Sequence, residues 1–147
     1  MNNTLVRKVI DRLRTAEEPS TRQTILATFG HWKTTSAGKH RQFHRVLTLL
    51  HDADGPRSVS ELRTALGISE RHLQRLFRAQ AGVPPKLYLR LLRFERAYHF
   101  LLNHPPLPNA EVAFRHGFAD GAHLSREFRS FCGATPRMVR TAAPLSS

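Results

Sequence analysis

The sequence of 147 residues contains very little cysteine and no long apolar run. Its single cysteine, Cys132, excludes an internal disulfide and any zinc site built on cysteines. No apolar run approaches the ~20 residues that a membrane-spanning helix needs. The N-terminus carries charges throughout and lacks the apolar core of a secretion signal. We therefore expect a cytoplasmic protein with no membrane partner, in which Cys132 is a small buried hydrophobe.

Motifs of catalysis are also missing. The sequence holds no nucleophile elbow, phosphate-binding loop or dinucleotide fingerprint, and its Ser and His residues have no recognisable triad context. His40 and His44 share a helix face, with His51 seven residues further on, but no carboxylate or cysteine stands at a fitting spacing for a metal. We expect no enzyme activity, no cofactor and no metal site.

Acidic residues are few: 11 Asp and Glu stand against 23 Lys and Arg, a formal net charge of +12. Such an excess favours a polyanionic partner, either nucleic acid or an anionic membrane surface. Most of the basic residues are arginine, whose planar guanidinium suits bidentate contact with phosphate and guanine. The alternative is a charge that serves solubility alone, but solubility rarely requires so large an excess of one sign.

The sequence also lacks the alternation of apolar and polar residues that marks a β-strand. We expect an all-α fold: two helix-turn-helix subdomains joined by a long central helix, with a short helical N-terminal extension. Apolar spacing and breakers predict helices at 4–16, 21–32 and 39–51, a first helix-turn-helix over about 58–82, a central helix over 86–103, a second helix-turn-helix over about 109–132, and a short helix that opens at Pro136. Residues 34–38 are predicted to be a linker. The predicted N-terminal caps are Thr4, Ser58 (in a capping box with Glu61), Ser69, Asn109 and Asp120.

The strongest pattern is a duplication. HLQRLFRAQAGVPP at 72–85 and HLSREFRSFCGATP at 123–136 fit one template at an offset of 51 residues, and upstream Gly67-Ile68 matches Gly117-Phe118 at an offset of 50. Each copy reads as a helix, a turn that pivots on glycine, and a second helix, which is the plan of a helix-turn-helix. Double-stranded DNA has a matching repeat, because its major groove returns every ~34 Å.

The second helix of the first copy separates apolar from polar residues. Leu73, Leu76 and Phe77 are expected to face inward, whereas Arg71, Gln74, Arg75 and Arg78 point away as a stripe of donors. Arginine suits guanine, glutamine suits adenine, and outer arginines suit phosphates. A solvated charged face would explain one such helix alone, but the turn, the duplication and the charge together favour DNA.

The second copy has fewer donors. Ala122 and Ser125 replace Arg71 and Gln74, while Arg126 and Arg129 match Arg75 and Arg78. Gly121 and Ala122, at the helix start where base edges are usually met, have no side-chain donor. We predict that the first motif discriminates bases and that the second mainly docks on phosphates. The apolar central helix, about 27 Å long at ~1.5 Å per residue, could hold the two recognition helices about one DNA turn apart.

Residues ~40–142 resemble the DNA-binding domain of AraC/XylS-type bacterial transcription regulators. The resemblance is carried by SVSELRTALGISERHLQRLFR (58–78), GVPPKLYLRLLRFERA (82–97) and HGFADGAHLSREFRSFCGATPRMVR (116–140). It implies two helix-turn-helix motifs, with recognition helices 69–81 and 120–132 in adjacent major grooves, and contact with RNA polymerase. It implies base contacts from Arg71, Gln74, Arg75, His123 and Arg126. Phosphate contacts are predicted for Arg78, Ser69, Arg129 and Ser125.

Three alternatives concern the N-terminal extension, 1–38, which precedes the expected DNA-binding domain (39–142) and a tail (143–147). Its two short apolar helices could pack on the domain, form a homodimer through residues 1–33 or bind another partner, or be the end of a sensor domain of a longer regulator. Two rival functions also stay open. One is a protein-interaction module that contacts RNA polymerase or another regulator with little DNA specificity, and the other is a non-specific nucleic-acid binder.

Overall fold

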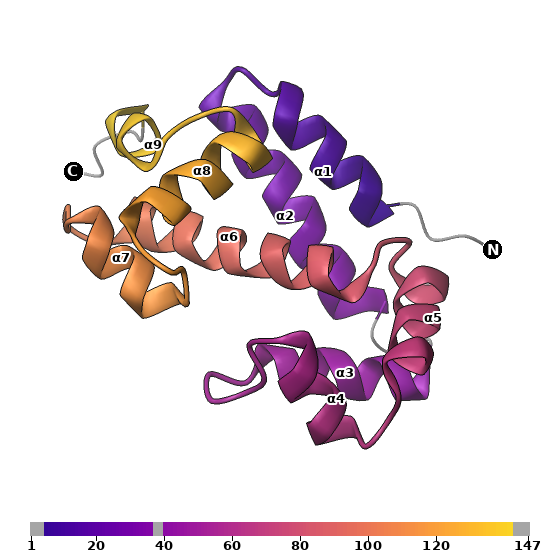
Figure 1. Cartoon of the computed structure of the whole chain (residues 1–147). Coiled ribbons are helices and arrows are strands. Elements are labelled where there is room, and N and C mark those ends of the chain that lie inside the picture. The colour runs from indigo at the N-terminus through magenta and orange to yellow at the C-terminus, as the bar shows by residue number, and fades with distance from the viewer. Residues whose placement is uncertain (1–4, 37–39, 143–147) are drawn as a thin grey trace. The chain divides into compact units, whose positions relative to one another are not determined.

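The computed structural model describes residues 5–36 and 40–142, and within these ranges the chain forms nine α-helices and no β-strand (Figure 1). The expected all-α fold is confirmed. A membrane-spanning helix needs a long apolar stretch, and none of these nine helices contains one. The helices are, in chain order, α1 (Leu5–Thr15), α2 (Pro19–Ser36), α3 (Arg41–His51), α4 (Val59–Leu66), α5 (Glu70–Gln80), α6 (Pro85–Asn103), α7 (Asn109–His116), α8 (Gly121–Cys132) and α9 (Pro136–Ala142).

The chain divides into two compact units. Unit 1 comprises Met1–Val9 and Leu26–Arg90, and unit 2 comprises Ile10–Ile25 and Leu91–Ser147. The first helix-turn-helix, α4–α5, therefore lies in unit 1, and the second, α7–α8, lies in unit 2. Each unit also takes residues from α1 and α2, so the N-terminal helices belong to the same compact units as the motifs.

Local side-chain bonds set the ends of the helices in the first motif. Ser58 Oγ accepts the N–H of Glu61 at 3.1 Å, and Glu61 Oε2 accepts the N–H of Arg57 at 2.7 Å. The predicted capping box is thus present. In the standard pattern the carboxylate accepts the N–H of the cap residue, here Ser58, whereas in this chain it accepts that of the preceding residue, Arg57. Gly67 ends α4 in the left-handed region at φ 67°, a conformation that other residues adopt only with strain. Ser69 begins α5 by accepting the N–H of His72 at 3.1 Å.

An aromatic cluster forms the core of unit 1. Its members are Phe29 and Trp32 of α2, Phe43 of α3, Phe77 of α5 and Tyr88 of α6, and each is at most 4% exposed. Ring centroids of Phe77 lie 5.4 Å from Phe43 and 5.3 Å from Tyr88, and Phe29 lies 5.7 Å from Tyr88. Helix α2 is therefore packed into the core that fixes α5.

Helix α2 of the N-terminal extension is longer than the predicted helix over 21–32. Helix α2 runs from Pro19 to Ser36, so the linker predicted over 34–38 is wrong for residues 34–36, and the rest of it lies outside the described residues. Thr and Ser only mildly disfavour a helix that tertiary packing holds in place. Val9, Ile10 and Leu13 are buried within the chain, which supports packing over pairing with another copy. The predicted cap Thr4 lies outside the described residues.

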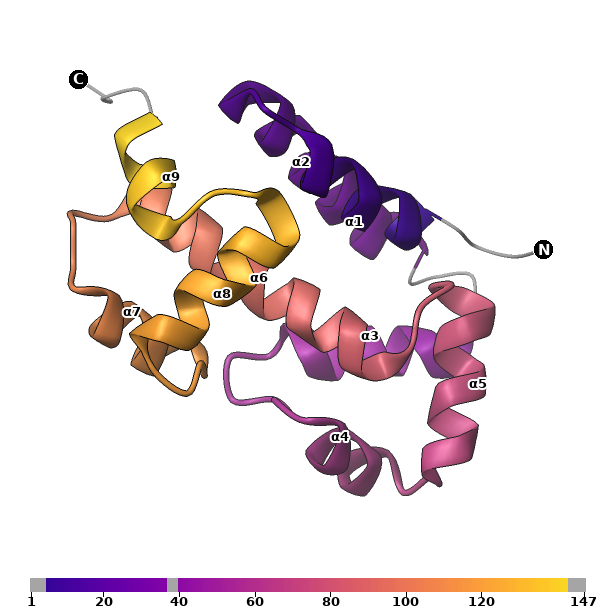
Figure 2. The same ribbon diagram turned by 45° about the horizontal axis from the view of Figure 1, so that its top comes forward.

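In unit 2, α7 and α8 pack side by side in both views (Figures 1 and 2). The prediction that Asn109 caps α7 is wrong, because Asn109 is the first helical residue and Pro108 precedes it without a side-chain bond. The carbonyl of Pro108 already accepts the N–H groups of Glu111 and Val112, at 3.0 and 3.2 Å. Asp120 does cap α8, since its Oδ1 accepts the N–H of His123 at 2.7 Å.

The core of unit 2 is built between α6 and α8. Phe94 of α6 lies 4.8 Å from Phe128 and 5.2 Å from Phe131 of α8, measured between ring centroids. Cys132 ends α8 as a free thiol that is 1% exposed, which confirms its prediction as a small buried hydrophobe. Burial raises the pKa of the Cys132 thiol above its usual value.

Candidate nucleic-acid interface

Helix α5 presents an apolar face to unit 1 and a polar face to solvent. Leu73, Leu76 and Phe77 are at most 6% exposed, as helical periodicity predicts. The side chains between these buried positions in the sequence lie on the opposite face of the helix and therefore project into solvent. The exposed polar residues are Arg71, Gln74, Arg75 and Arg78.

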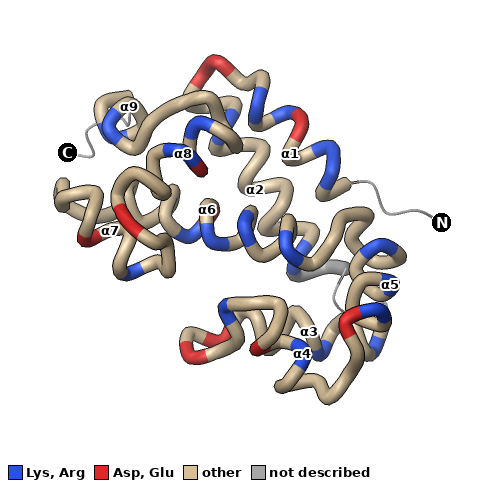
Figure 3. The backbone as a smooth tube through the Cα atoms, viewed as in Figure 1, with Lys and Arg blue, Asp and Glu red and all other residues tan. Residues whose placement is uncertain are grey.

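The cations of this face are available to a partner. Within the described part of the chain, the guanidinium groups of Arg71, Arg75 and Arg78 make no ion pair or hydrogen bond. Basic positions recur along α5, and its one carboxylate, Glu70, lies in the first helical turn (Figure 3). A surface with exposed, uncompensated arginines on one helix is suited to phosphate oxygens and to the acceptor edge of guanine.

Helix α8 has a similar apolar face but a weaker polar one. Leu124 and Phe128 are fully buried, at the positions that Leu73 and Phe77 hold in the first motif. Arg126 and Arg129 are exposed and, among the described residues, form no ion pair. Ser125 is half-buried and Ala122 is exposed without a side-chain donor.

Close packing explains the glycine at the start of α8. A Cβ atom on Gly121 would come within 3.3 Å of Asn109 Cβ and 3.4 Å of the backbone nitrogen of Ala110, both at the start of α7. These distances are tighter than most contacts that a real Cβ makes. The sequence showed only that this position lacks a donor, whereas the structure shows that its small size lets α8 approach α7.

The two turns differ in length. Residues 67–69 connect α4 to α5, and residues 117–120 connect α7 to α8. The second turn therefore holds one additional residue, Ala119, which is the reason why the offset between the copies changes from 50 to 51. Both turns begin in the same way, with a left-handed glycine at φ 67° and φ 80°.

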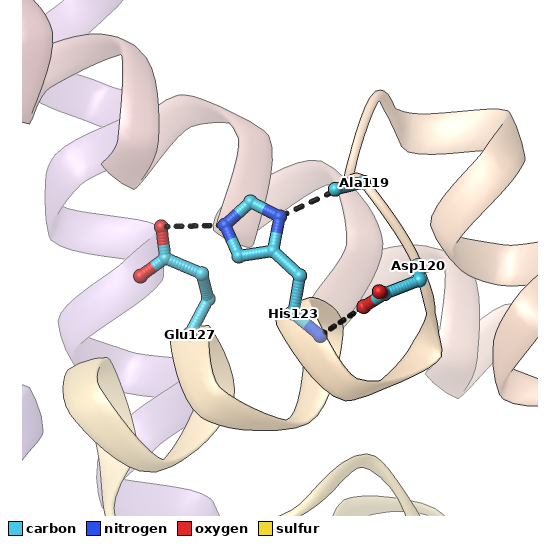
Figure 4. Close-up of polar contacts among 4 residues, drawn as sticks. All are labelled: Ala119, Asp120, His123 and Glu127. Atoms are coloured by element: carbon cyan, nitrogen blue, oxygen red, sulfur yellow. Dashed lines mark hydrogen bonds and ion pairs between the residues drawn. The ribbon is translucent and has the colours of Figure 1, made fainter.

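His123 lies inside the second motif rather than on its outer face. Its Nδ1 accepts the N–H of Ala119 at 3.0 Å, and its Nε2 lies 3.6 Å from Oε1 of Glu127 (Figure 4). The ring also meets Phe118 edge-on, with centroids 5.5 Å apart. The His123 side chain is 27% exposed and that of Glu127 only 9%. Sequence reasoning overlooked Glu127, although the aligned copies place it opposite a leucine, Leu76.

Comparisons with known proteins agree with this architecture. A family model described as a helix-turn-helix domain matches residues 62–142, more than half of the chain. The HTH-type transcriptional activator RhaR of Cronobacter sakazakii is 39% identical over 87 residues, which make up 59% of this chain and 30% of that protein. The transcriptional activator NphR of a Rhodococcus species is 36% identical over 119 residues, 77% of this chain and 34% of that protein. The chain thus spans about a third of the length of these curated relatives.

A solved structure has a similar fold. The crystal structure of a transcriptional regulator of the AraC-type DNA-binding class from Chromobacterium violaceum covers 82% of this chain and 99% of its own, at a TM-score of 0.58 and 25% identity. Two glycine-pivoted helix-turn-helix units in one all-helical chain, a matching family model and AraC-type structural similarity lead to one assignment. The chain belongs to the AraC family of helix-turn-helix transcription regulators.

Proposed function

We propose that this chain is a sequence-specific regulator of transcription that binds double-stranded DNA, with recognition helices 69–81 and 120–132 in adjacent major grooves. The first motif reads bases and the second mainly docks on phosphates. One observation carries the proposal: the exposed donors of the two recognition helices are unequal. Helix α5 offers Arg71 and Gln74 where α8 offers Ala122 and Ser125.

The proposed contacts follow from the chemistry of these side chains. Arg71 and Arg75 suit the O6 and N7 acceptors of guanine, and Gln74 suits adenine. Ser69 can still donate to a phosphate, because its oxygen accepts the N–H of His72 and its own hydrogen is left for a partner. Arg126 is the exposed arginine of α8 that corresponds to Arg75. The remaining phosphate contacts fall to Arg78, Arg129 and Ser125.

The proposal extends to the rest of the chain and to a protein partner. Residues 39–142 act as the DNA-binding domain, and residues 1–38 act as a helical extension of it. RNA polymerase is the proposed partner, since RhaR and NphR are named transcriptional activators. A homodimer through residues 1–33 is the alternative role of the extension, although its apolar side chains Val9, Leu13 and Phe29 are buried within the chain.

Selection from random double-stranded oligonucleotides tests the function. We expect a motif about one helical turn long, with its stronger half bound by α5. Arg71→Ala should cost ~1–3 kcal/mol on the selected site and relax one base position. Arg126→Ala and Arg129→Ala should weaken binding to every sequence and each reduce the salt slope by about 1.

Other outcomes of the selection would favour the rival functions. Equal loss on selected and random DNA after Arg71→Ala would contradict base reading, and binding without any enriched motif would indicate a non-specific nucleic-acid binder. Capture of RNA polymerase or another regulator without a DNA footprint would instead indicate a protein-interaction module. An unchanged salt slope for Arg129→Ala would contradict its phosphate contact.

A further inference from the structure

We propose that His123 is a positioning residue for the second recognition helix and does not read a base edge. This inference rests on the proposed function, because the helix that His123 positions is the one proposed to dock on DNA. It replaces the base contact that the family resemblance implies for His123.

The backbone N–H groups of a packed turn need hydrogen-bond acceptors. In the first motif, the N–H groups of Gly67 and Ile68 both point to the carbonyl of Arg63, at 2.8 and 3.3 Å. In the second motif, those of Gly117 and Phe118 point to the carbonyl of Ala113 in the same manner. The N–H of the additional residue, Ala119, is accepted instead by His123 Nδ1.

Because Nδ1 accepts a hydrogen bond, a neutral His123 carries its hydrogen on Nε2. That nitrogen faces the carboxylate of Glu127, a residue that is only 7% exposed. A carboxylate in such a place requires polar neighbours, and His123, one helical turn earlier, supplies one. Both ring nitrogens are therefore directed at groups of the motif itself.

The first motif provides the contrast. Its corresponding histidine, His72, makes no side-chain hydrogen bond within the described residues. Its turn lacks the additional residue, and Leu76, 6% exposed, stands where the second motif has Glu127. The longer turn and the buried carboxylate thus occur in the same motif, and both of them contact the His123 ring.

His123 consequently anchors the start of α8 through two bonds. Its backbone N–H is accepted by the cap residue Asp120, and its ring accepts the N–H of Ala119 on the other side of that cap. Loss of the ring should release the turn and the first residues of α8, and this release should weaken docking on every DNA sequence alike.

The test compares His123→Ala with His123→Asn in the full chain. The amide oxygen of asparagine can take the place of Nδ1 as an acceptor, so this variant should rescue the turn. For His123→Ala we expect about fivefold weaker binding to both selected and random DNA, the equivalent of one ordinary hydrogen bond, with the base preference unchanged. The amide of Ala119 should lose its protection from hydrogen exchange in this variant and regain it in His123→Asn. The matched control, His72→Ala, should leave that protection intact.

Specific results would overturn the inference. A change of preference at one base pair without a general loss of affinity would assign His123 to base reading, and an Ala119 amide that exchanges equally slowly in His123→Ala would remove the positioning bond. If His123→Ala does not fold, the ring tautomer of the wild-type chain decides, since a proton on Nδ1 in its ¹⁵N NMR spectrum contradicts the bond. The exchange and tautomer measurements need no DNA. Failure of the wild-type chain to bind DNA would therefore refute the proposed function separately.

Discussion

Replacing Phe29 by alanine tests whether the N-terminal helix α2 is part of the core that supports α5, the proposed first recognition helix. The Phe29 side chain is fully buried, and its ring lies 6.1 Å from Trp32 and 5.7 Å from Tyr88. Tyr88 in turn meets Phe77 of α5 at 5.3 Å. Truncation at position 29 therefore leaves a cavity next to the residues that hold α5.

The size of the effect follows from burial. Truncation of a buried phenylalanine to alanine costs ~3–5 kcal/mol, and the ring contacts contribute ~0.5–1.5 kcal/mol of such a loss. We expect Phe29→Ala to lower the free energy of unfolding by about 4 kcal/mol. With an m-value of about 2 kcal/mol/M, the midpoint of urea unfolding should then fall by about 2 M.

The chain offers a matched control and a local probe. Phe114 on α7 is 84% exposed, so Phe114→Ala makes the same chemical change with an expected effect within about 0.5 kcal/mol. Trp32 is the single tryptophan of the chain, and its fluorescence reports on the cluster while circular dichroism reports on all helices. Coincident transitions by both probes justify a two-state treatment. A midpoint for Phe29→Ala equal to that of Phe114→Ala would refute the packing of α2 into this core.

Two further predictions concern the second motif. The double replacement Ala122→Arg and Ser125→Gln should give α8 the donors of α5 and add base discrimination of ~1–3 kcal/mol per contact to the second half-site. The control is Ser130→Arg, which adds a positive charge at an exposed position of the same helix. Equal gains in base discrimination for the control and the double variant would contradict this prediction. Burial raises the pKa of the Cys132 thiol, so this thiol ionises at a lower pH in the unfolded chain than in the folded one. Its contribution to the free energy of unfolding is therefore present below the ordinary thiol pKa and declines as the pH rises above that value. Urea unfolding across that pH range should show the decline in the wild type and not in Cys132→Ala, and an equal decline in both would exclude this cause.

The elements that could be predicted from the sequence are those set by local interactions. Ser58, Ser69 and Asp120 cap their helices because a cap needs only a side-chain oxygen and an N–H three residues away. The inward position of Leu73 and Phe77 follows from helical periodicity in the same local manner. The family resemblance extended these local patterns to the order of the helices.

Features that depend on distant contacts were beyond the sequence pattern. Residues 34–36 have the composition of a linker, yet they continue a helix whose preceding turns bury Phe29 and Trp32. The apolar spacing of α6 predicts an inward stripe of Leu87, Leu91, Phe94, Tyr98 and Leu101. In the structure Tyr88 is fully buried whereas Leu87 is only half-buried, because α6 is apolar on several sides and its neighbours decide which side is covered. The ring of His123 could not be placed from its position in the repeat, since its contacts depend on an inserted residue and on a carboxylate one turn later.

The differences between the two motifs are of two physical kinds, and under the proposed function only the outward kind should affect the choice of DNA sequence. Inward differences, such as Glu127 in place of Leu76, must be accommodated by neighbours in the same unit, because a buried carboxylate without polar contacts destabilises the fold. Outward differences, such as Ala122 in place of Arg71, make no contact that the fold requires. A partner is then the remaining source of constraint on the outward positions. Sequence specificity should accordingly be altered by exchanging outward residues between the motifs, whereas exchange of inward residues should alter stability first.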